Sequence, residues 1–372
     1  MKSIIPVNQP DLSPKAKTYV VDAVTSGLVS SAGPYIKKFE ESYARWLGVR
    51  HAVTVTNGTA ALHLALAALD IGQGDEIIIP DLTIISCPLA ALYCGATPVF
   101  VDVDPVTFTI DATQLESQIT KHTKAIMPVH LYGHPADMDP IMAIANKHKL
   151  YVVEDAAEAH GAKYKGKLVG SIGDIGCFSF YANKVVTTGE GGMVVTNNSK
   201  LADRMRLLKD LAHSPKKRFY HEQVGYNYRM TNLAAALGLA QLESVEKYIA
   251  KKKWMARMYK KYLTGIPHLV LPPQMPWAES VYWMYAITLT PDAPITKDTL
   301  RKKLLEQGVD TRDFFYPLHT QPILKKYHKK GDRFPVSVSA ANRGFYLPSG
   351  LAISEKQIHQ VAHVLNHTLT NL

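Results

Sequence analysis

The strongest constraint on the fold is a repeated pattern of short apolar strands, turns and helices between residues 51 and 197. Segments rich in β-branched and apolar residues predict strands at 51–56, 76–80, 97–104, 124–133, 150–157, 175–181 and 191–197. Strands this apolar are covered on both faces, and their alternation with helical segments favours parallel pairing. The sequence therefore predicts an α/β fold, with a mainly parallel seven-stranded sheet flanked by helices.

The segments before and after this region of alternating strands and helices have other patterns. Helices are expected at 13–27 and 33–48, each with a proline in its first turn and a glycine at its end. After residue 231 the pattern predicts a smaller α+β part, with a long helical stretch at 231–263, a strand at 281–289 and helices at 296–308 and 354–369. We expect a large domain at 1–245, N-terminal helices included, and a small domain at 246–372.

The composition indicates a globular protein. Hydrophobic residues make up 47% of the chain and charged residues 20%. No apolar run approaches the roughly 18 residues of a membrane span, and residues 1–15 lack the apolar core of a secretory signal. Three cysteines without C-x-x-C spacing argue against a disulfide framework or a zinc site. We expect a cytoplasmic protein that binds neither a membrane nor a metal.

The net charge of +10 has two explanations. The basic clusters at 216–218, 251–253 and 325–330 are short and scattered, and no basic arm interleaved with aromatic residues is present, which argues against nucleic acid binding. Solvated helix faces and loops account for such clusters most simply. The best functional use of the surplus is attraction of a small anionic substrate, such as a phosphate or a nucleotide.

Two polar clusters follow predicted strands, where α/β proteins bind their ligands. The turn Asn57-Gly58-Thr59 leads into a helix, whose free N–H groups and dipole suit a phosphate, although Asn-Gly is also a common turn. Glu154 and Asp155 end a strand, and a carboxylate there could hold a protonated ring nitrogen or simply cap the next turn.

A third cluster contains one lysine, Lys184, after the strand that includes Ser179 and before a glycine-rich turn. A buried lysine has a lowered pKa and can form a Schiff base, whereas a surface lysine is the ordinary alternative. Ser179 could reach an anion, and the glycines let the backbone approach a ligand. A fourth cluster, 224–236, precedes a helix that Thr231 could cap.

The order of these groups along the chain is informative. A phosphate cradle, a carboxylate at a strand end and then an amine are the three groups that pyridoxal phosphate requires for its phosphate, its ring nitrogen and its aldehyde. Together they predict a pyridoxal phosphate enzyme.

Three stretches carry a resemblance to a known family. "EDAAEAHGA", "GDIGCFSFYANKVVTTGEGGMVVTN" and "GYNYRMTNLAAALGLAQLE" closely resemble the DegT/StrS sugar-nucleotide aminotransferases, and the similarity runs nearly from end to end. The resemblance implies the fold type I architecture, pyridoxal phosphate as cofactor with pyridoxamine phosphate as its second form, and a homodimer with shared active sites. It also implies glutamate as amino donor and a nucleotide-linked keto sugar as acceptor.

The resemblance also implies roles for individual residues. Lys184 would form the Schiff base with the cofactor and act as the acid and base. The other cofactor-binding positions would be Gly58, Thr59, Ser179 and Asn227 of the neighbouring subunit for the phosphate, Asp155 for the ring nitrogen, Glu158 near the ring hydroxyl, and Ile84 over the ring, where the family often has an aromatic residue. Substrate-binding candidates are His160, Lys216, Arg218, Arg229 and His319.

The chain most resembles the members that aminate C4 of a 4-keto-6-deoxy sugar nucleotide, with GDP-4-keto-6-deoxymannose as the first candidate. The alternatives are dTDP- or UDP-linked 4-keto or 3-keto sugars. Some relatives have histidine in place of the lysine and are dehydratases, so the intact Lys184 favours transamination. A desulfurase or a non-catalytic regulator is a further alternative, which the apolar settings of the cysteines and the presence of Lys184 and Asp155 disfavour.

Overall fold

The computed structural model describes residues 4–214, 216–217, 219–328 and 331–371. Its largest sheet has seven strands in the order β1-β9-β8-β5-β4-β2-β3. Their bounds are β1 His51–Val55, β2 Glu76–Pro80, β3 Thr97–Val101, β4 Thr123–Ile126, β5 Tyr151–Asp155, β8 Ile175–Ser179 and β9 Gly192–Thr196. Only β9 runs antiparallel to its neighbours, β1 and β8, whereas the other neighbouring strands pair in parallel. The predicted sheet is confirmed.

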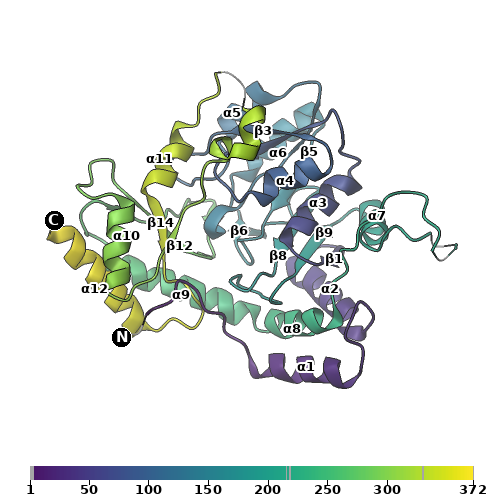
Figure 1. The fold of residues 1–372 in the computed structure, drawn as a ribbon, viewed down its shortest axis with the longest axis horizontal. Helices are drawn as coiled ribbons and strands as arrows, with labels where there is room; N and C mark the ends of the chain where they lie inside the picture. Colours follow the sequence, from purple (N-terminus) through teal and green to yellow (C-terminus); the bar gives the residue numbers. More distant parts are fainter. Residues whose placement is uncertain (1–3, 215, 218, 329–330, 372) are drawn as a thin grey trace.

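Helices cover this sheet on both faces, as the uniformly buried strands require (Figure 1). They are α2 Pro34–Leu47, α3 Gly58–Ala68, α4 Ser86–Tyr93, α5 Ala112–Gln118, α6 Met138–His148 and α7 Ser199–Lys209. α3 is apolar around almost its whole circumference, because it is enclosed by β8 and β9 on one side and by α4 and α7 on the other. A helix that is hydrophobic all round is a buried helix.

The remaining helices lie along or beyond the sheet. α1 Pro14–Thr25 packs on α8, and the predicted helical stretch 231–263 is divided at Glu243–Ser244 into two helices. These are α8 Asn232–Leu242, which Thr231 caps by accepting a hydrogen bond from Ala234 N–H, and α9 Val245–Leu263. In Figure 1 α8 and α9 run beneath both the large sheet and the C-terminal elements.

The C-terminal elements form a second layered unit with its own apolar core. A four-stranded antiparallel sheet has the order β10-β12-β14-β13, with bounds Leu269–Val270, Tyr285–Leu289, Gly344–Leu347 and Arg312–Asp313. Its helices are α10 Lys297–Glu306, α11 Pro335–Arg343 and α12 Glu355–Thr370. A third sheet, β11-β6-β7, comprises Ala278–Glu279, Lys163–Tyr164 and Lys167–Leu168, and short 3₁₀ turns span Leu131–Gly133, Leu318–Thr320 and Pro322–Tyr327.

The predicted strand at 281–289 is wrong in its first half. Tyr282 has a φ of 50°, in the left-handed region that interrupts an extended strand, and β12 begins only at Tyr285. Residues 281–284 therefore lie outside the strand, and Trp283 in this segment lines the cavity that is described below.

The beginning of the chain joins the C-terminal unit. Ile5 N–H donates to the Gly308 carbonyl at 2.8 Å, and Asp310 N–H donates to the Ile5 carbonyl at 3.1 Å, which forms a parallel bridge. Ile5 belongs to the C-terminal core, and the division at 245/246 stays a prediction. Among the described residues, no helix has the length and apolarity needed to cross a membrane.

Candidate active site

A cavity of about 330 Å³ lies at the carboxyl ends of β5 and β8. The sheet side supplies Asp155 and Ser179, and the C-terminal unit supplies Trp283, Phe315 and Tyr346. All predicted cofactor-binding residues except Asn227 line it, namely Gly58, Thr59, Ile84, Asp155, Glu158, Ser179 and Lys184. Residues far apart in the sequence therefore meet where parallel strands end, as the topology predicts.

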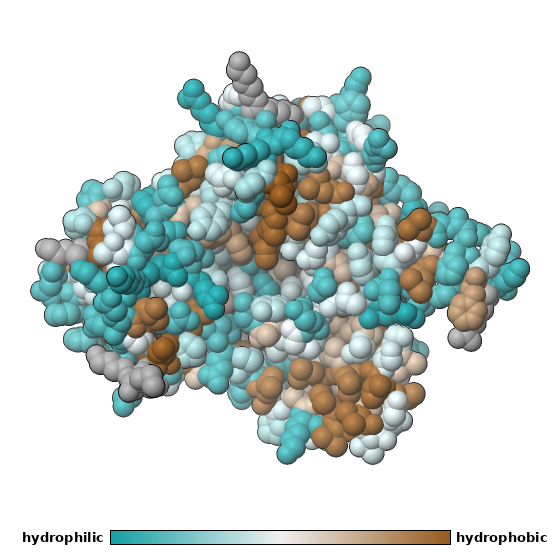
Figure 2. Space-filling view, in the orientation of Figure 1, coloured by the Kyte–Doolittle hydropathy of each residue, from teal (hydrophilic) through white to brown (hydrophobic). Residues whose placement is uncertain are grey.

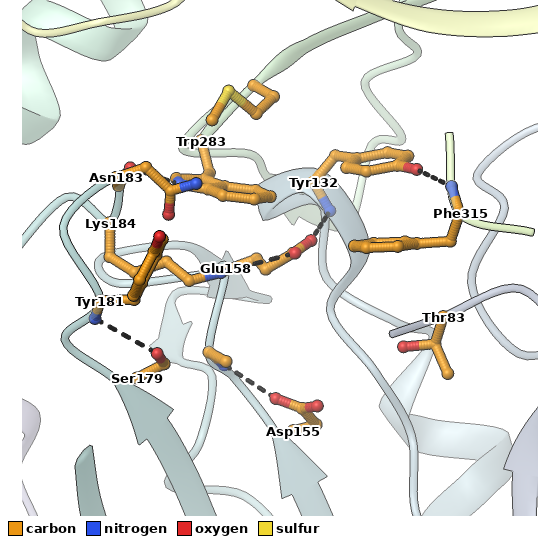
Figure 3. A network of polar contacts seen from close by, with 12 residues as sticks. Thr83, Tyr132, Asp155, Glu158, Ser179, Tyr181, Asn183, Lys184, Trp283 and Phe315 are labelled. Carbon is orange, nitrogen blue, oxygen red and sulfur yellow. Dashed lines mark hydrogen bonds and ion pairs between the residues drawn. The ribbon is translucent and has the colours of Figure 1, made fainter. Parts of the chain in front are cut away.

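Lys184 extends into this cavity from the turn after β8 (Figure 3). Its Nζ lies 3.5 Å from Glu158 Oε1 and 3.8 Å from the centroid of the Trp283 ring, and its side chain is 8% exposed. Burial lowers the pKa of Lys184, although the carboxylates of Glu158 and Asp155 act in the opposite direction. The shift favours the neutral amine, which is the nucleophilic form.

Glu158 holds its carboxylate between the backbone and this amine. Its Oε2 accepts a hydrogen bond from Tyr132 N–H at 2.9 Å, while Oε1 faces Lys184. Burial raises the pKa of Glu158, and the nearby Lys184 and the Tyr132 N–H partly offset that effect. Tyr132 donates from a left-handed conformation with φ of 53°, a backbone geometry that often occurs at functional sites.

Glu154, one residue before the cavity-lining Asp155, is a structural carboxylate. Successive side chains of a strand point to opposite faces, so Glu154 turns away from the cavity and accepts three backbone N–H bonds at 2.7 Å from the loop 170–173. His130 Nδ1 accepts from Ala136 N–H, so its Nε2 donates to Glu154 at 3.0 Å. Burial raises the pKa of Glu154, but these hydrogen bonds outweigh burial and lower it.

Asp155 keeps its carboxylate at the cavity. Oδ1 accepts from Ala157 N–H at 3.0 Å and Oδ2 from the Cys87 thiol at 3.1 Å. A buried carboxylate that lines a cavity is suited to a protonated ring nitrogen. Cys87 is buried and its pKa is raised well above the usual value, mainly by desolvation, so it serves as a hydrogen-bond donor rather than as a thiolate.

The start of α3 forms an anion cradle. The N-cap Asn57 Oδ1 accepts from Ala60 N–H at 2.8 Å, and the first-turn N–H groups of Gly58 and Thr59 have no intrahelical acceptor. A Cβ at position 58 would lie 2.8 Å from the Ser179 Cβ, so the bare backbone fits closely against the serine. Thr59 Oγ1 donates to Ser86 Oγ at 2.9 Å. N–H groups, hydroxyls and a positive helix end together fit a phosphate.

Aromatic residues close the cavity from the C-terminal side. Trp283 lies over the Lys184 amine, and Phe315 stacks on Tyr132 with centroids 5.9 Å apart and an interplanar angle of 12° (Figure 3). Ile84, 37% exposed, lines the cavity, and its contact with a cofactor ring stays a prediction. The cavity thus has groups suited to a phosphate, a ring nitrogen and an aldehyde, and it fits pyridoxal phosphate.

Two predicted substrate-binding histidines do not line the cavity. His160 is fully buried behind it, with its ring 5.3 Å from Phe178 and 5.6 Å from Phe180, and burial is the main cause that lowers its pKa to about 3. His319 contacts Asp81 twice. Its ring Nδ1 lies 2.7 Å from Oδ2, and its backbone N–H donates to Oδ1 at 2.8 Å. Within one chain both histidines thus make packing or anchoring contacts, and their predicted contact with substrate stays a prediction.

The remaining predicted residues lie on the segment before α8. Asn227 is exposed and accepts from Arg229 Nε at 3.0 Å, and Arg229 also pairs with Asp210 at 3.2 Å. Lys216 is exposed, and Arg218 lies outside the described residues. Asn227, Lys216 and Arg229 therefore do not line the cavity within one chain, and the predicted contacts of all four residues with a shared site or a substrate stay predictions.

Several cavity residues were absent from the sequence prediction. Trp283 lies in a segment that resembles a strand, and Phe315 and Tyr346 lie in the C-terminal unit, where no strand end of the large sheet indicates a site. Asn183 precedes Lys184 directly, and the "YANK" motif could have indicated it.

Comparisons with known proteins agree with this geometry. The DegT/DnrJ/EryC1/StrS aminotransferase family matches residues 10–366. GDP-perosamine synthase of Caulobacter vibrioides is 44% identical, covering 98% of both chains, and GDP-perosamine synthase of Escherichia coli O157:H7 is 45% identical, covering 97% of this chain and 98% of the relative. The PLP-form structure of Spr1654 from Streptococcus pneumoniae superposes with a TM-score of 0.94 at 26% identity, covering 99% of each chain.

The sheet, the cavity at its carboxyl edge and the buried lysine define a pyridoxal phosphate aminotransferase of fold type I. The chain belongs to the DegT/DnrJ/EryC1/StrS aminotransferase family. The predicted family, fold and cofactor are confirmed.

Proposed function

We propose that this enzyme transfers an amino group from glutamate to C4 of GDP-4-keto-6-deoxymannose and so forms GDP-perosamine. The observation that carries the proposal is the presence of the Lys184, Asp155 and Gly58–Thr59 groups in one cavity of a chain 44–45% identical to two GDP-perosamine synthases over nearly its full length. A dTDP- or UDP-linked keto sugar is the alternative acceptor.

The residues of the cavity divide the work. Pyridoxal phosphate, when bound, supplies an aldehyde that takes up the amino group and a ring that stabilises negative charge on the reacting carbon. Lys184 would attach the cofactor and then, once released, move the proton at Nζ between the reacting carbons. Asp155 would hold the proton at the ring nitrogen, and Gly58, Thr59 and Ser179 would bind the phosphate.

Glu158 would affect the protonation of the Lys184 amine, and the aromatic residues of the cavity would affect its exposure to water. The Glu158 carboxylate, 3.5 Å from Lys184 Nζ, can hold or return a proton at that nitrogen. Trp283, Phe315 and Tyr346 line the side of the cavity that faces the C-terminal unit, and their rings would exclude water there.

A two-step absorbance experiment tests this function. Glutamate is added to the cofactor-loaded enzyme, and the change in the cofactor's absorbance is followed. GDP-4-keto-6-deoxymannose, or the dTDP- or UDP-linked 4-keto-6-deoxyglucose, is then added. We expect the original absorbance to return with the GDP sugar alone. Return with another sugar only would move the substrate assignment, and no conversion with any amino donor would contradict an aminotransferase.

Two lysine variants serve as controls for the same experiment. Lys184→Ala is expected to bind pyridoxamine phosphate but to lose turnover, since it removes the group that moves the proton. Lys200→Ala changes an exposed lysine of α7 and should behave as the wild type. Normal turnover by Lys184→Ala would overturn the role of Lys184.

We also propose that the enzyme is a cytoplasmic homodimer. Leu12, Val21, Val24, Leu28 and Val29 are 43–56% exposed, and Figure 2 shows an apolar surface over α1. A contiguous apolar surface of this kind is suited to a protein partner. Free Cys87, Cys94 and Cys177 suit a reducing compartment.

Mixing subunits tests the shared site. Lys184→Ala and Asn227→Ala variants are combined after mild dissociation. If Asn227 acts across the dimer interface, the mixture regains activity that neither variant has alone. A monomeric mass by light scattering, or no recovery in a mixture shown to exchange subunits, would contradict the proposal.

A further inference from the structure

Lys252 is a buried lysine that has no task in the proposed mechanism. It lies in the middle of α9 and is 1% exposed. Burial lowers its pKa to about 7. In the described part of the chain its amine contacts two main-chain carbonyls and forms no ion pair with a carboxylate. Lysine is seldom fully buried without a charged partner, so these contacts require an explanation.

The Lys252 amine joins two segments at one end of a strand pair. It donates to the carbonyl of Trp283 at 2.9 Å and to the carbonyl of Ser349. Trp283 precedes β12 and Ser349 follows β14, and these strands pair with Tyr285 opposite Leu347. One side chain of α9 therefore fixes the main chain on both strands where they reach the cavity.

A second contact from α9 supports the same arrangement. Tyr259, seven residues after Lys252 and on the same helix face, donates its hydroxyl to the Pro348 carbonyl at 2.7 Å. Ser349 Oγ in turn accepts from Tyr285 N–H at 2.9 Å. Hydrogen bonds from Tyr259 and Lys252 thus attach the turn after β14 to α9, and Lys252 also attaches the main chain of Trp283.

The indole of Trp283 is fixed at its other end beside the catalytic lysine. Its Nε1 donates to the carbonyl of Asn183 at 2.8 Å, and its ring centroid lies 3.8 Å from Lys184 Nζ (Figure 3). Trp283 is 3% exposed. A continuous set of contacts therefore runs from the Lys252 amine, through Trp283, to the Lys184 amine.

We propose that Lys252 is a positioning residue, which holds the main chain of Trp283 and thereby keeps the indole ring against the Lys184 amine. Both the ammonium and the neutral amine have N–H donors for the two carbonyls, so this role does not depend on one charge state. The inference rests on the proposed role of Lys184 but not on the identity of the sugar.

Tryptophan fluorescence tests this role in the holoenzyme. Trp283 is the tryptophan that lines the cavity in the described part of the chain, so bound cofactor should quench its emission. Lys252→Met should lose at least half of the quenching and slow the half-reaction with glutamate at least fivefold. Lys253→Met is the matched control, because Lys253 is the next residue of α9, partly exposed and paired with Glu279. It should change neither quantity.

A double-mutant cycle separates positioning from a general effect on structure. In a Trp283→Phe background, Lys252→Met should slow the half-reaction less than twofold further, because its effect passes through the indole. A full fivefold loss in that background, or wild-type quenching in Lys252→Met, would overturn the proposal.

Two further outcomes are distinguishable. Lys252→Gln is a milder second variant, which keeps an N–H donor. If both variants fail to fold, the proposal is overturned, since Lys252 would then be a requirement of the fold. If the wild type shows quenching but no conversion with glutamate, the proposed function fails, and the quenching comparison alone decides the role of Lys252.

Discussion

Glu154 and Asp155 are adjacent buried carboxylates, and their different hydrogen-bond partners indicate different roles. Glu154 has His130 and three backbone N–H groups as partners on the face away from the cavity. Asp155 has one backbone N–H and a thiol, and it lines the cavity. The carboxylate with the fuller set of internal partners stabilises the fold, and the other remains available to a ligand.

Replacing each carboxylate by its amide should separate these effects. Asp155→Asn should bind cofactor yet slow the half-reaction by about a hundredfold or more, because the amide cannot hold a proton at the ring nitrogen. Glu154→Gln should lower the free energy of unfolding by about 2 kcal/mol, since its amide NH₂ would face N–H donors. Half-reaction kinetics and urea unfolding of both variants provide the measurements. Similar losses in both quantities for the two variants would contradict the assignment.

His160 should make the protein sensitive to acid. Its pKa is about 3 when folded and near 6.5 when unfolded, so between these values the unfolded chain binds a proton that the native state excludes. Stability is therefore lost as the pH falls from about 6.5 towards 3. His160→Phe should remove this dependence and reduce the loss between pH 7 and pH 5 by roughly 1–2 kcal/mol. Equal loss of unfolding free energy in wild type and variant would disprove this explanation.

Among the elements, the start of α3 should tolerate little added volume, because Gly58 lies close to Ser179 in the cavity. Gly58→Ala would place a Cβ 2.8 Å from the Ser179 Cβ, in the cradle proposed for the phosphate. We expect the dissociation constant for pyridoxal phosphate to rise about tenfold or more, which corresponds to a loss of about 1.4 kcal/mol. Equilibrium dialysis measures it. Gly72→Ala is a control at a glycine where an added Cβ would meet only the Cys94 carbonyl oxygen, at 3.7 Å, and it should leave cofactor binding unchanged.

The elements also show what the sequence could predict. Alternating strands and helices, proline starts and glycine ends located most elements to within a few residues, because those signals are local. Tyr282 has no such signal. Its left-handed conformation is imposed by the tertiary arrangement that brings Trp283 to the cavity, so the strand at 281–289 was predicted too long.

The cavity residues likewise fall into a group that the sequence could predict and a group that it could not. Residues at the ends of sheet strands or at the start of α3 were predictable, because strand order brings those ends together. Trp283, Phe315 and Tyr346 were not, because their positions depend on how the C-terminal unit packs against the sheet. His160, a predicted substrate-binding residue, lies two positions after Glu158 in the sequence, yet its buried ring packs on Phe178 and Phe180 and does not line the cavity.

For the whole molecule, Asp102 anchors the C-terminal unit to the large sheet. This 1% exposed carboxylate follows β3 and accepts from the N–H groups of Val336 and Ser337, at 2.9 and 2.8 Å, in the first turn of α11. It also accepts from the Ser337 hydroxyl at 2.6 Å. An acidic group at a helix N-terminus is favourable, and here it comes from another part of the chain.

Asp102→Ala should therefore destabilise the whole protein. We expect a loss of about 3 kcal/mol, since it leaves buried N–H groups without acceptors, whereas Ser337→Ala should lose only about 1 kcal/mol. Urea unfolding gives both values, and Asp203→Ala, at an exposed aspartate of α7, is the control. A loss below 1 kcal/mol in Asp102→Ala would show that the two units hold together without this contact.

The bridge between Ile5 and Val309 has a consequence for synthesis. These residues are about three hundred positions apart, so the contact has a very high contact order. At roughly 5–20 residues per second, the ribosome adds Val309 some 15–60 s after Ile5. Throughout that interval Ile5 has no bridge partner, whereas the last strand of the large sheet, β9, ends at Thr196, so this sheet has all of its strands well before Val309 is added. Completion of the C-terminal core, and with it closure of the cavity by Trp283, Phe315 and Tyr346, is therefore a late event in the life of the nascent chain.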